Sequence, residues 1–211
     1  MMVELYVLDR RQTPSLAQLR SAVTEAEWVH AQGFRTHLLQ TRYLASRAFL
    51  RHHIGQRLQI APLAVTITLG AYQKPLLTHA PWHFSLSHSR DITVLALAPH
   101  VVGVDIEHTD TPFPAPLAPL LLHPHELPIA SNSAELYRHW CSKEAVLKAY
   151  GTGLQTDPRH ILLTQSQASL FEHTYYLHTE LLMANLLCVL AQPHPFTSLK
   201  RHDGCAIQCR S

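Results

Sequence analysis

The order of helical and extended patterns along the chain constrains its fold more than any other sequence feature. Alternating or continuous apolar residues predict strands at 3–8, 63–69, 84–98, 101–107, 161–164, 169–179 and 185–191. Apolar residues at helical spacing predict helices at 15–32, 38–54 and 133–150. Because helices and strands do not alternate regularly, we predict an α+β fold rather than a doubly wound α/β sheet.

Local signals predict where several of these elements begin and end. Thr24-x-x-Glu27 and Asn132-x-x-Glu135 are capping boxes, each expected to open a helix. Gly55 and Gly151 follow helical patterns and are expected to end them. The buried stripe of the 38–54 helix is expected to include Leu38, Ala45 and Phe49.

Two segments that contain proline are expected to interrupt regular structure. Pro99 and His100 form a polar turn, so the strands at 84–98 and 101–107 are predicted to be neighbours. Residues 111–128 carry six prolines and no glycine, which predicts a loop or a broken short helix.

The composition indicates a folded protein. Hydrophobic residues make up 46% of the 211 residues, enough for a core, and no run of 18 apolar residues predicts a membrane span. The first residues lack the pattern of a secretion signal, so we expect a cytoplasmic protein without a membrane partner. Four scattered cysteines do not form a disulfide framework.

The charges divide unevenly along the chain. Residues 1–100 hold ten Lys or Arg and five Asp or Glu, a balance of +5, whereas residues 101–211 hold seven and ten, a balance of −3. A basic half facing an acidic half would hold an anion on one side and a metal on the other. Accidental variation of the surface is the alternative.

The segment Gly103–Glu107 (GVDIE) is the first candidate site. On a strand, Asp105 and Glu107 would share one face, since successive side chains point to opposite sides. Two neighbouring carboxylates repel one another unless a cation lies near them, and hard oxygen ligands suit Mg²⁺. A solvated strand face that ends in a turn is the alternative.

Two further segments carry polar groups of interest. Glu144 and Lys148 lie four residues apart on one helix face and could serve a metal and a phosphate, or could form a simple exposed ion pair. Ser87 and His88 could donate hydrogen bonds to phosphate, or His88 could be structural. At the C-terminus, His202-x2-Cys205-x3-Cys209 could make part of a zinc site but lacks a fourth ligand at a usual spacing.

Taken together and in order, three segments resemble the 4′-phosphopantetheinyl transferases. They are Phe84–Ser89 (FSLSHS), Gly103–Glu107 (GVDIE) and Trp140–Leu154 (WCSKEAVLKAYGTGL). The family pattern reads roughly F-N-x-S-H-S, then G-[ILV]-D-[ILV]-E, then W-[ST]-x-K-E-[AS]-x-x-K-x-x-G-x-G-L. The chain is most similar to the monomeric members that activate surfactin synthetase and other peptide, polyketide and fatty-acid synthases.

Other positions extend the resemblance or depart from it. Lys74 in Tyr72–Pro75 is similar to the family's G-K-P turn, and Arg42 with Arg47-x-x-x-Arg51 is similar to a helix that carries a cofactor-binding arginine. The departures replace no charged group: they are Ser85 for the usual Asn, Gln73 for Gly, and Cys141 for Ser or Thr.

The resemblance implies an enzyme, a holo-acyl-carrier-protein synthase, that transfers the phosphopantetheine arm of coenzyme A to a serine of an apo acyl or peptidyl carrier protein and releases 3′,5′-ADP. Phosphoryl transfer of this kind needs charge neutralisation, alignment and a proton acceptor. The resemblance implies that Asp105, Glu107 and Glu144 hold Mg²⁺. It further implies that Glu144, or Glu107 through water, takes the serine proton, and that Lys148 stabilises the departing phosphate.

The same resemblance implies where coenzyme A binds. The residues expected to hold its nucleotide and phosphate end are Arg42, Arg47, Lys74, Ser87, His88 and Lys148. Arg42 and Arg47 are about 140° apart on an ideal helix, so we expect both to face one phosphate only if Arg42 precedes the helix. Glu126 in His123–Glu126 resembles an acidic position of the family whose role here stays open.

The implied fold consists of two similar α+β halves related by a pseudo-twofold axis, with the cofactor between them. Residues 1–100 would supply the coenzyme A side, and residues 101–211 the metal-binding and catalytic side, all within a monomer. Two alternatives remain: another Mg²⁺-dependent phosphodiesterase or nuclease, and a non-catalytic module that binds carrier proteins. The net charge of +2 argues against a nucleic-acid partner, and the intact acidic triad argues against a module that only binds.

Overall fold

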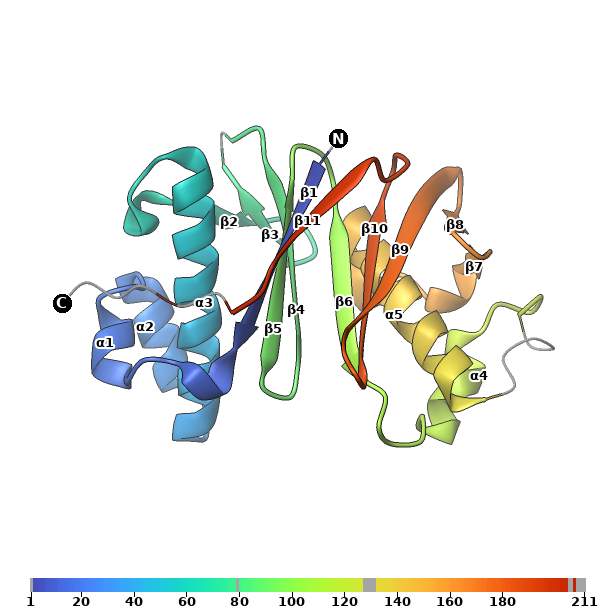
Figure 1. Ribbon diagram of the computed structural model, residues 1–211, viewed down its shortest axis with the longest axis horizontal. Helices are drawn as coiled ribbons and strands as arrows, with labels where there is room; N and C mark the ends of the chain where they lie inside the picture. Colours follow the sequence, from blue (N-terminus) through green and yellow to red (C-terminus); the bar gives the residue numbers. More distant parts are fainter. Residues whose placement is uncertain (1, 79, 127–131, 205–206, 208–211) are drawn as a thin grey trace.

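Two β-sheets pack face to face, and helices cover the outer face of each (Figure 1). The computed structural model describes residues 2–78, 80–126, 132–204 and 207. The helices are α1 (Leu16–Arg20), α2 (Glu25–Gln32), α3 (His37–Leu58), α4 (Ala118–Leu121) and α5 (Ser133–Tyr150). This confirms the prediction of an α+β fold. Whether the halves are related by a pseudo-twofold stays a prediction.

The first sheet has the strand order β11-β1-β5-β4. Its strands are β1 (Met2–Asp9), β4 (His83–Ser89), β5 (Ile92–Ala98) and β11 (Ser198–His202). The helix α3 covers its outer face, where Phe49 of α3 and Leu95 of β5 belong to one buried cluster. A separate two-stranded ribbon, β2 (Ile67–Leu69) and β3 (Pro75–Leu77), lies beside β4.

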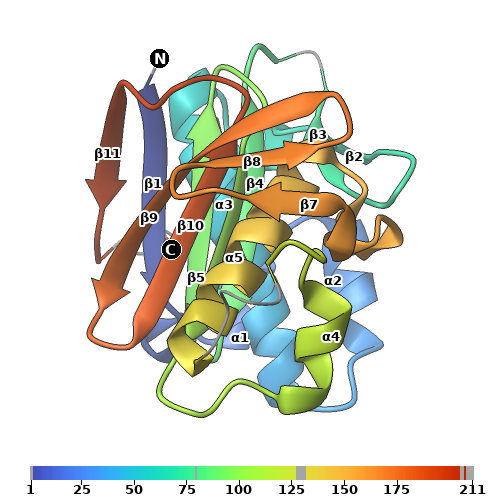
Figure 2. The ribbon, with the colours of Figure 1, turned by 90° about the vertical axis from the view of Figure 1, so that its right-hand side faces the viewer.

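The second sheet has the strand order β6-β10-β9-β8-β7. Its strands are β6 (Gly103–His108), β7 (Ile161–Leu163), β8 (Gln167–Leu170), β9 (His173–Met183) and β10 (Leu186–Gln192). Helix α5 packs on its outer face, as the turned view in Figure 2 shows. Between the two sheets lies a third apolar cluster, to which Val94 of β5 and Ile106 of β6 contribute. Complementary apolar faces thus hold the two halves together.

Several sequence predictions about strands were wrong. The apolar run 84–98 is a hairpin of β4 and β5, because Arg90 adopts a left-handed conformation with φ 48° and makes a tight turn without glycine. Likewise the run 169–179 is divided at Phe171, with φ 53°. The strand β6 lies beside β4 of the 84–98 run, as predicted, but its backbone pairs with β10. Of the predicted strand 63–69, only Ile67–Leu69 forms a β-strand.

The last described strand was missed by the sequence reading and changes the division into halves. β11 runs parallel to β1 and pairs with it from Ser198 to His202. The predicted C-terminal half, residues 101–211, therefore supplies one strand to the other sheet. The hydrophobic pattern did not predict β11, because an edge strand needs no continuous apolar run and its polar residues are exposed.

The helix predictions were closer to the structure. Both capping boxes open helices, although only Thr24 shows the full reciprocal pair with Glu27. Gly55 does not end α3, which continues to Leu58 and ends at Gln59 in the left-handed conformation. Instead, an added Cβ at Gly55 would lie 2.9 Å from the carbonyl oxygen of Ile60, so the glycine lets the following loop pack back. Leu38, predicted on the buried stripe, is 57% exposed.

Burial of His53 on α3 makes the stability of this half depend on pH. The imidazole stacks on Tyr6 at a ring distance of 4.3 Å, and burial lowers the pKa of His53 to about 3. Because this folded-state pKa lies below the unfolded value of about 6.5, the stabilisation is present above pH 6.5 and is lost as the pH falls towards 3. Between pH 6.5 and 5 the expected loss is about 2 kcal/mol.

Denaturant unfolding of the wild type and of His53→Phe at the two pH values measures this loss. Between pH 6.5 and 5, we expect the free energy of unfolding to fall by about 2 kcal/mol less in His53→Phe than in the wild type, because phenylalanine cannot titrate. His37→Phe, an exposed position on the same helix, is the control and should behave as the wild type does. Equal pH dependence in all three proteins would contradict the prediction.

Candidate active site

The strand β6 and the helix α5 approach each other unusually closely at Gly103. A Cβ added to Gly103 would lie 1.9 Å from the carbonyl oxygen of Ala145 and 2.6 Å from the backbone nitrogen of Ala149. Only glycine allows this contact, because every other residue would force the helix away. The close contact brings the acidic face of β6 against the helix turn that carries Glu144 and Lys148.

Asp105, Lys148 and Ser87 meet where the three sequence motifs converge. Lys148 Nζ lies 2.7 Å from Asp105 Oδ1 and donates to Ser87 Oγ at 3.0 Å. Ser87 Oγ in turn donates to Asp105 Oδ1 at 2.7 Å. Lys148 thus reaches across to the strands, and among the described residues no ion pair joins it to Glu144. The alternative of a simple exposed Glu144–Lys148 pair is therefore not what the structure shows.

The three carboxylates predicted to hold a metal influence one another electrostatically. Burial raises the pKa of Glu144, and the negative charge of Asp105 raises it further. The pKa of Glu107 is also raised, mainly by burial, although the hydroxyl of Ser89 opposes the shift. Both shifts express the cost of holding negative charges together in a partly buried place.

This donor set fits a hard cation, although its side chains are not arranged as a finished metal site. Asp105 Oδ2 is buried and accepts no hydrogen bond from the described residues. Carboxylate oxygens that lack a partner and repel each other are the chemistry that Mg²⁺ satisfies. In the part of the chain that the structure describes, however, no three His, Cys, Asp or Glu side chains lie close enough together to hold a metal ion.

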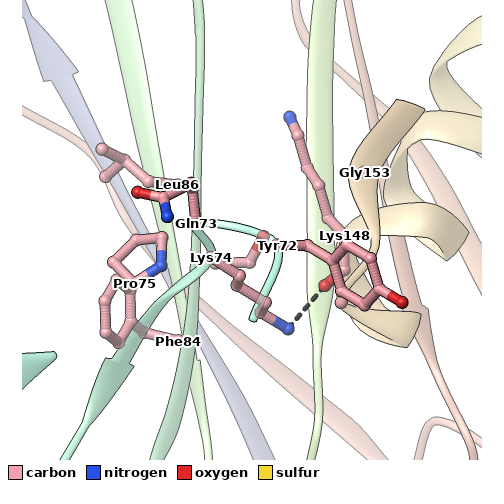
Figure 3. A pocket seen from close by; sticks show the side chains of 10 residues that line it. Tyr72, Gln73, Lys74, Pro75, Phe84, Leu86, Lys148 and Gly153 are labelled. Atoms are coloured by element: carbon pink, nitrogen blue, oxygen red, sulfur yellow. Dashed lines mark hydrogen bonds between the residues drawn. The ribbon is translucent and has the colours of Figure 1, made fainter. Parts of the chain in front are cut away.

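Lys74 connects the two halves beside this cluster (Figure 3). Its Nζ donates to the carbonyl oxygen of Lys148 at 2.5 Å, near the C-terminal end of α5. Burial lowers the pKa of Lys74 to about 8. A cavity of about 210 Å³ adjoins it, with walls formed by Tyr72, Gln73, Lys74, Pro75, Phe84 and Lys148. Apolar and aromatic walls beside two ammonium groups suit a flat ring that carries a phosphate.

A second cavity, of about 570 Å³, is lined by three of the six residues predicted to bind the nucleotide and phosphate end. Arg42, Arg47 and His88 line it, together with Glu107. Arg42 lies within α3, and both arginines nevertheless line this cavity; whether both face one phosphate stays a prediction. Long arginine side chains can bend around a helix, so backbone angle alone does not decide where the guanidinium lies.

Both arginines already have acidic partners. Arg47 Nε donates to Glu27 Oε1 at 2.6 Å, and Arg42 donates to Asp91 at 2.5 Å. Glu27 also accepts from the buried Arg51, at 2.7 Å. Sequence reasoning assigned Glu27 only to a helix cap, whereas the structure shows that it also holds Arg47 beside the cavity.

Glu126, whose role the sequence left open, is a buried structural anchor. Its Oε2 accepts from Lys143 Nζ at 2.6 Å, and its Oε1 accepts from the backbone of Leu163 at 2.8 Å. Lys143 is fully buried and also donates to the carbonyl of Leu121. This pair ties the proline-rich segment to α5 and β7.

Cys205 and Cys209, the other residues of the possible zinc site, lie outside the described residues.

Sequence reasoning missed two groups next to the carboxylates. Ser89 donates to Glu107 Oε2 at 2.9 Å, and the indole of Trp140 also lowers the pKa of Glu107 through a hydrogen bond. The alternation of Ser85, Ser87 and Ser89 on one strand was a visible signal for the first. Trp140 was visible as the first residue of the third motif, but nothing in the motif indicated that its indole would contact Glu107.

Several known proteins have sequences similar to this chain. Residues 101–195 match the family model of the 4′-phosphopantetheinyl transferase superfamily. The chain is 27% identical over 161 residues to L-aminoadipate-semialdehyde dehydrogenase-phosphopantetheinyl transferase of Rattus norvegicus, a match that covers 66% of this chain and 52% of that protein. It is also 27% identical over 153 residues to 4′-phosphopantetheinyl transferase psf-1 of Bacillus pumilus, covering 69% of this chain and 65% of the relative.

A cyanobacterial protein shows the same degree of similarity. 4′-Phosphopantetheinyl transferase HetI of Nostoc sp. is 28% identical over 151 residues, which cover 66% of this chain and 64% of HetI. The matched part thus spans between half and two thirds of these curated relatives.

The two sheets and the two cavities define an α+β protein in which an acidic strand and helix lie beside cavities lined by arginine and lysine. The resemblance suggested by the three motifs is confirmed: residues 101–195 match the 4′-phosphopantetheinyl transferase superfamily, and the similar curated proteins carry that name.

Proposed function

We propose that the chain transfers the 4′-phosphopantetheine group of coenzyme A to a serine hydroxyl of an apo acyl or peptidyl carrier protein and releases 3′,5′-ADP. The observation that carries this proposal is the contact of Lys148 with both Asp105 and Ser87, which joins the three motifs at one point. The names of the curated relatives and the matched superfamily support it.

The chemistry assigns a task to each charged residue. The serine oxygen of the carrier attacks the phosphorus that bears the pantetheine arm, and the bond from that phosphorus to the leaving 3′,5′-ADP breaks. Glu144, whose pKa burial raises, accepts the serine proton, directly or with Glu107 acting through water. Lys148 donates to the phosphate oxygens as negative charge builds on the leaving group.

Asp105, Glu107 and Glu144 would hold Mg²⁺, which supplies charge neutralisation at the pyrophosphate when it is bound. Arg42, Arg47 and His88 would bind the 3′-phosphate end from the second cavity, and Lys74 would lie on the nucleotide side. Ser87 is included with that group, although in this structure it donates to Asp105.

We further propose that the protein acts as a cytoplasmic monomer of the surfactin-synthetase-activating type, without a membrane or nucleic-acid partner. In support, both cavities and all three motifs lie in one chain. No helix among the described residues is both long and apolar enough to cross a bilayer.

Incubation with coenzyme A, Mg²⁺ and an apo carrier protein tests the proposal. A mass gain of one phosphopantetheine on the carrier, absent when its target serine is replaced by alanine, is the expected result. Release of nucleotides from DNA would favour a nuclease instead. Formation of a stable complex with the carrier without a mass gain would favour a binding module.

Lys148 gives a sharper test of the mechanism. Lys148→Ala should lower kcat by roughly 10²-fold, because its interaction strengthens as charge develops on the leaving group. Lys148→Arg should recover only part of the rate, since a planar guanidinium does not replace a compact ammonium. Single-turnover kinetics measure both effects.

A surface lysine provides the control for this test. Lys200→Ala, at an exposed position of β11, should leave kcat unchanged. Thermal melting should show that Lys148→Ala remains folded with a loss of about 1–3 kcal/mol, the cost of removing the ammonium partner of Asp105, which keeps its hydrogen bond from Ser87. Unchanged turnover in Lys148→Ala would remove this residue from the mechanism.

A further inference from the structure

Three alternate serines of β4 bind three alternate backbone amides of β6. The amide of Val104 donates to Ser85 Oγ at 3.0 Å, that of Ile106 to Ser87 Oγ at 3.4 Å, and that of His108 to Ser89 Oγ at 3.2 Å. Each pair is separated by 19 residues, so the two strands run parallel and in register. We call Ser85, Ser87 and Ser89 the serine ladder.

Hydrogen bonds to the serine ladder connect the two sheets where no backbone-to-backbone pairing joins them. The strands β4 and β6 are edges of different sheets and share no backbone pairing. Buried amides at a sheet edge need acceptors, and a serine hydroxyl on every second residue supplies them across a wider gap than a carbonyl could span. The register of one half against the other is therefore set by side chains at the site.

Two of the three hydroxyls also hold a carboxylate of β6. Ser87 donates to Asp105 Oδ1 at 2.7 Å, and Ser89 donates to Glu107 Oε2 at 2.9 Å. No carboxylate of the described residues accepts from Ser85. A hydroxyl has one proton to donate. Each of the two serines donates this proton to a carboxylate and accepts a hydrogen bond from the neighbouring backbone amide.

Each of the two carboxylates is held by two groups. Asp105 accepts from Ser87 and Lys148, and Glu107 accepts from Ser89 and from the indole of Trp140. Ser89 is 9% exposed and Ser87 6%, so water does not readily replace either hydroxyl. Loss of Ser89 should therefore remove the buried hydroxyl donor of Glu107, although the indole of Trp140 would still contact the carboxylate.

We propose that Ser89 is a positioning residue that orients Glu107 for cation binding and couples its position to the joint between the two halves. The proposal rests on the proposed function, because it takes Glu107 as a ligand of Mg²⁺. Hydrogen-bond partners of metal-ligating carboxylates fix the orientation of the ligand, and their loss typically weakens metal binding 10–100-fold.

Ser89→Ala and Ser85→Ala form a matched pair for the test. Each removes one acceptor of a β6 amide, but only the first removes the donor to a carboxylate. Calorimetric titration of Mg²⁺ into the protein saturated with coenzyme A, without carrier protein, gives the Mg²⁺ dissociation constant in the absence of turnover. We expect this constant to rise about 10-fold or more in Ser89→Ala.

The other variants are expected to keep the wild-type affinity. Ser85→Ala should bind Mg²⁺ as the wild type does, even if it melts at a lower temperature. Ser89→Thr keeps the hydroxyl and should restore most of the affinity. Equal Mg²⁺ affinity in Ser89→Ala and the wild type would overturn the proposal, and so would equal weakening in Ser85→Ala and Ser89→Ala, which would reduce the serine ladder to a structural joint.

The design separates this proposal from the proposed function. If the wild type fails to bind coenzyme A or transfers nothing to a carrier, the proposed function fails and with it the premise about Glu107. If the wild type binds coenzyme A, binds Mg²⁺ and transfers the arm, but Ser89→Ala is indistinguishable from it, only the assignment of Ser89 fails.

Discussion

Asp105→Ala is expected to lower kcat/KM by roughly 10³-fold or more while the protein stays folded. The alanine removes a predicted metal ligand and with it several kcal/mol of charge stabilisation in the transition state. It also releases Lys148, whose Nζ lies 2.7 Å from Asp105 Oδ1, so two of the three motifs lose their common contact. Transfer of the phosphopantetheine arm at saturating Mg²⁺, followed by mass spectrometry of the carrier, measures the loss.

A carboxylate away from the site is the control for this prediction. Asp203→Ala removes an exposed partner of Arg201 on the edge of the first sheet and should leave the rate unchanged. Circular dichroism and thermal melting of Asp105→Ala establish that the variant folds. Near-normal turnover of the folded variant would contradict the assignment of Asp105 to the metal and to Lys148.

Gly103→Ala is expected to destabilise the protein by about 3 kcal/mol or more and to abolish most transfer. The added methyl group would lie 1.9 Å from the carbonyl oxygen of Ala145, a contact with helix backbone that no side-chain rotation can relieve. Overpacking of a rigid contact typically costs 1–3 kcal/mol, and a clash this close lies at or above the upper end. Moving α5 away from β6 would also displace Glu144 and Lys148 from the acidic strand.

Gly33→Ala is the matched control, and its effect should have the opposite sign. Gly33 has φ −75° at the end of α2, and the nearest atom to an added Cβ is a carbonyl oxygen at 3.4 Å. Alanine fits this conformation and restricts the unfolded chain, which typically stabilises a protein by about 0.4–1 kcal/mol. Denaturant unfolding compares both variants with the wild type. A small change in Gly103→Ala would mean that α5 can shift without cost.

Some features of the candidate site could be predicted from the local sequence, whereas others depend on contacts between distant residues. The spacing of Asp105 and Glu107 on a strand, and of Glu144 and Lys148 on a helix, could be read directly from the sequence, because side-chain direction repeats with the period of each element. The partner of Lys148 could not, since an i,i+4 carboxylate is the nearest candidate along the chain. The structure shows that Lys148 reaches Asp105 and Ser87, which are 43 and 61 residues away.

The acidic and basic halves illustrate the same limit. The +5 and −3 balances suggested an anion site beside a metal site, and the two cavities lie where the halves meet. The charge balance did not show that Glu27 and Asp91 already hold Arg47 and Arg42. These ion pairs join residues far apart in the sequence, so they depend on how α2, α3 and the β4–β5 turn pack.

By itself, the sequence determined the class of the fold, the α5 helix from Ser133 to Tyr150 and the resemblance to the family, because these depend on local periodicity, capping and short motifs. Only the tertiary structure decided the edge strand β11, the close contact at Gly103 and the serine ladder, and only the backbone showed the local turn at Arg90. The first three result from the packing of segments distant along the chain, where burial and unpaired backbone groups outweigh local preference. The functional groups of this protein come together at such contacts, and for that reason their partners could not be read from the residues alone.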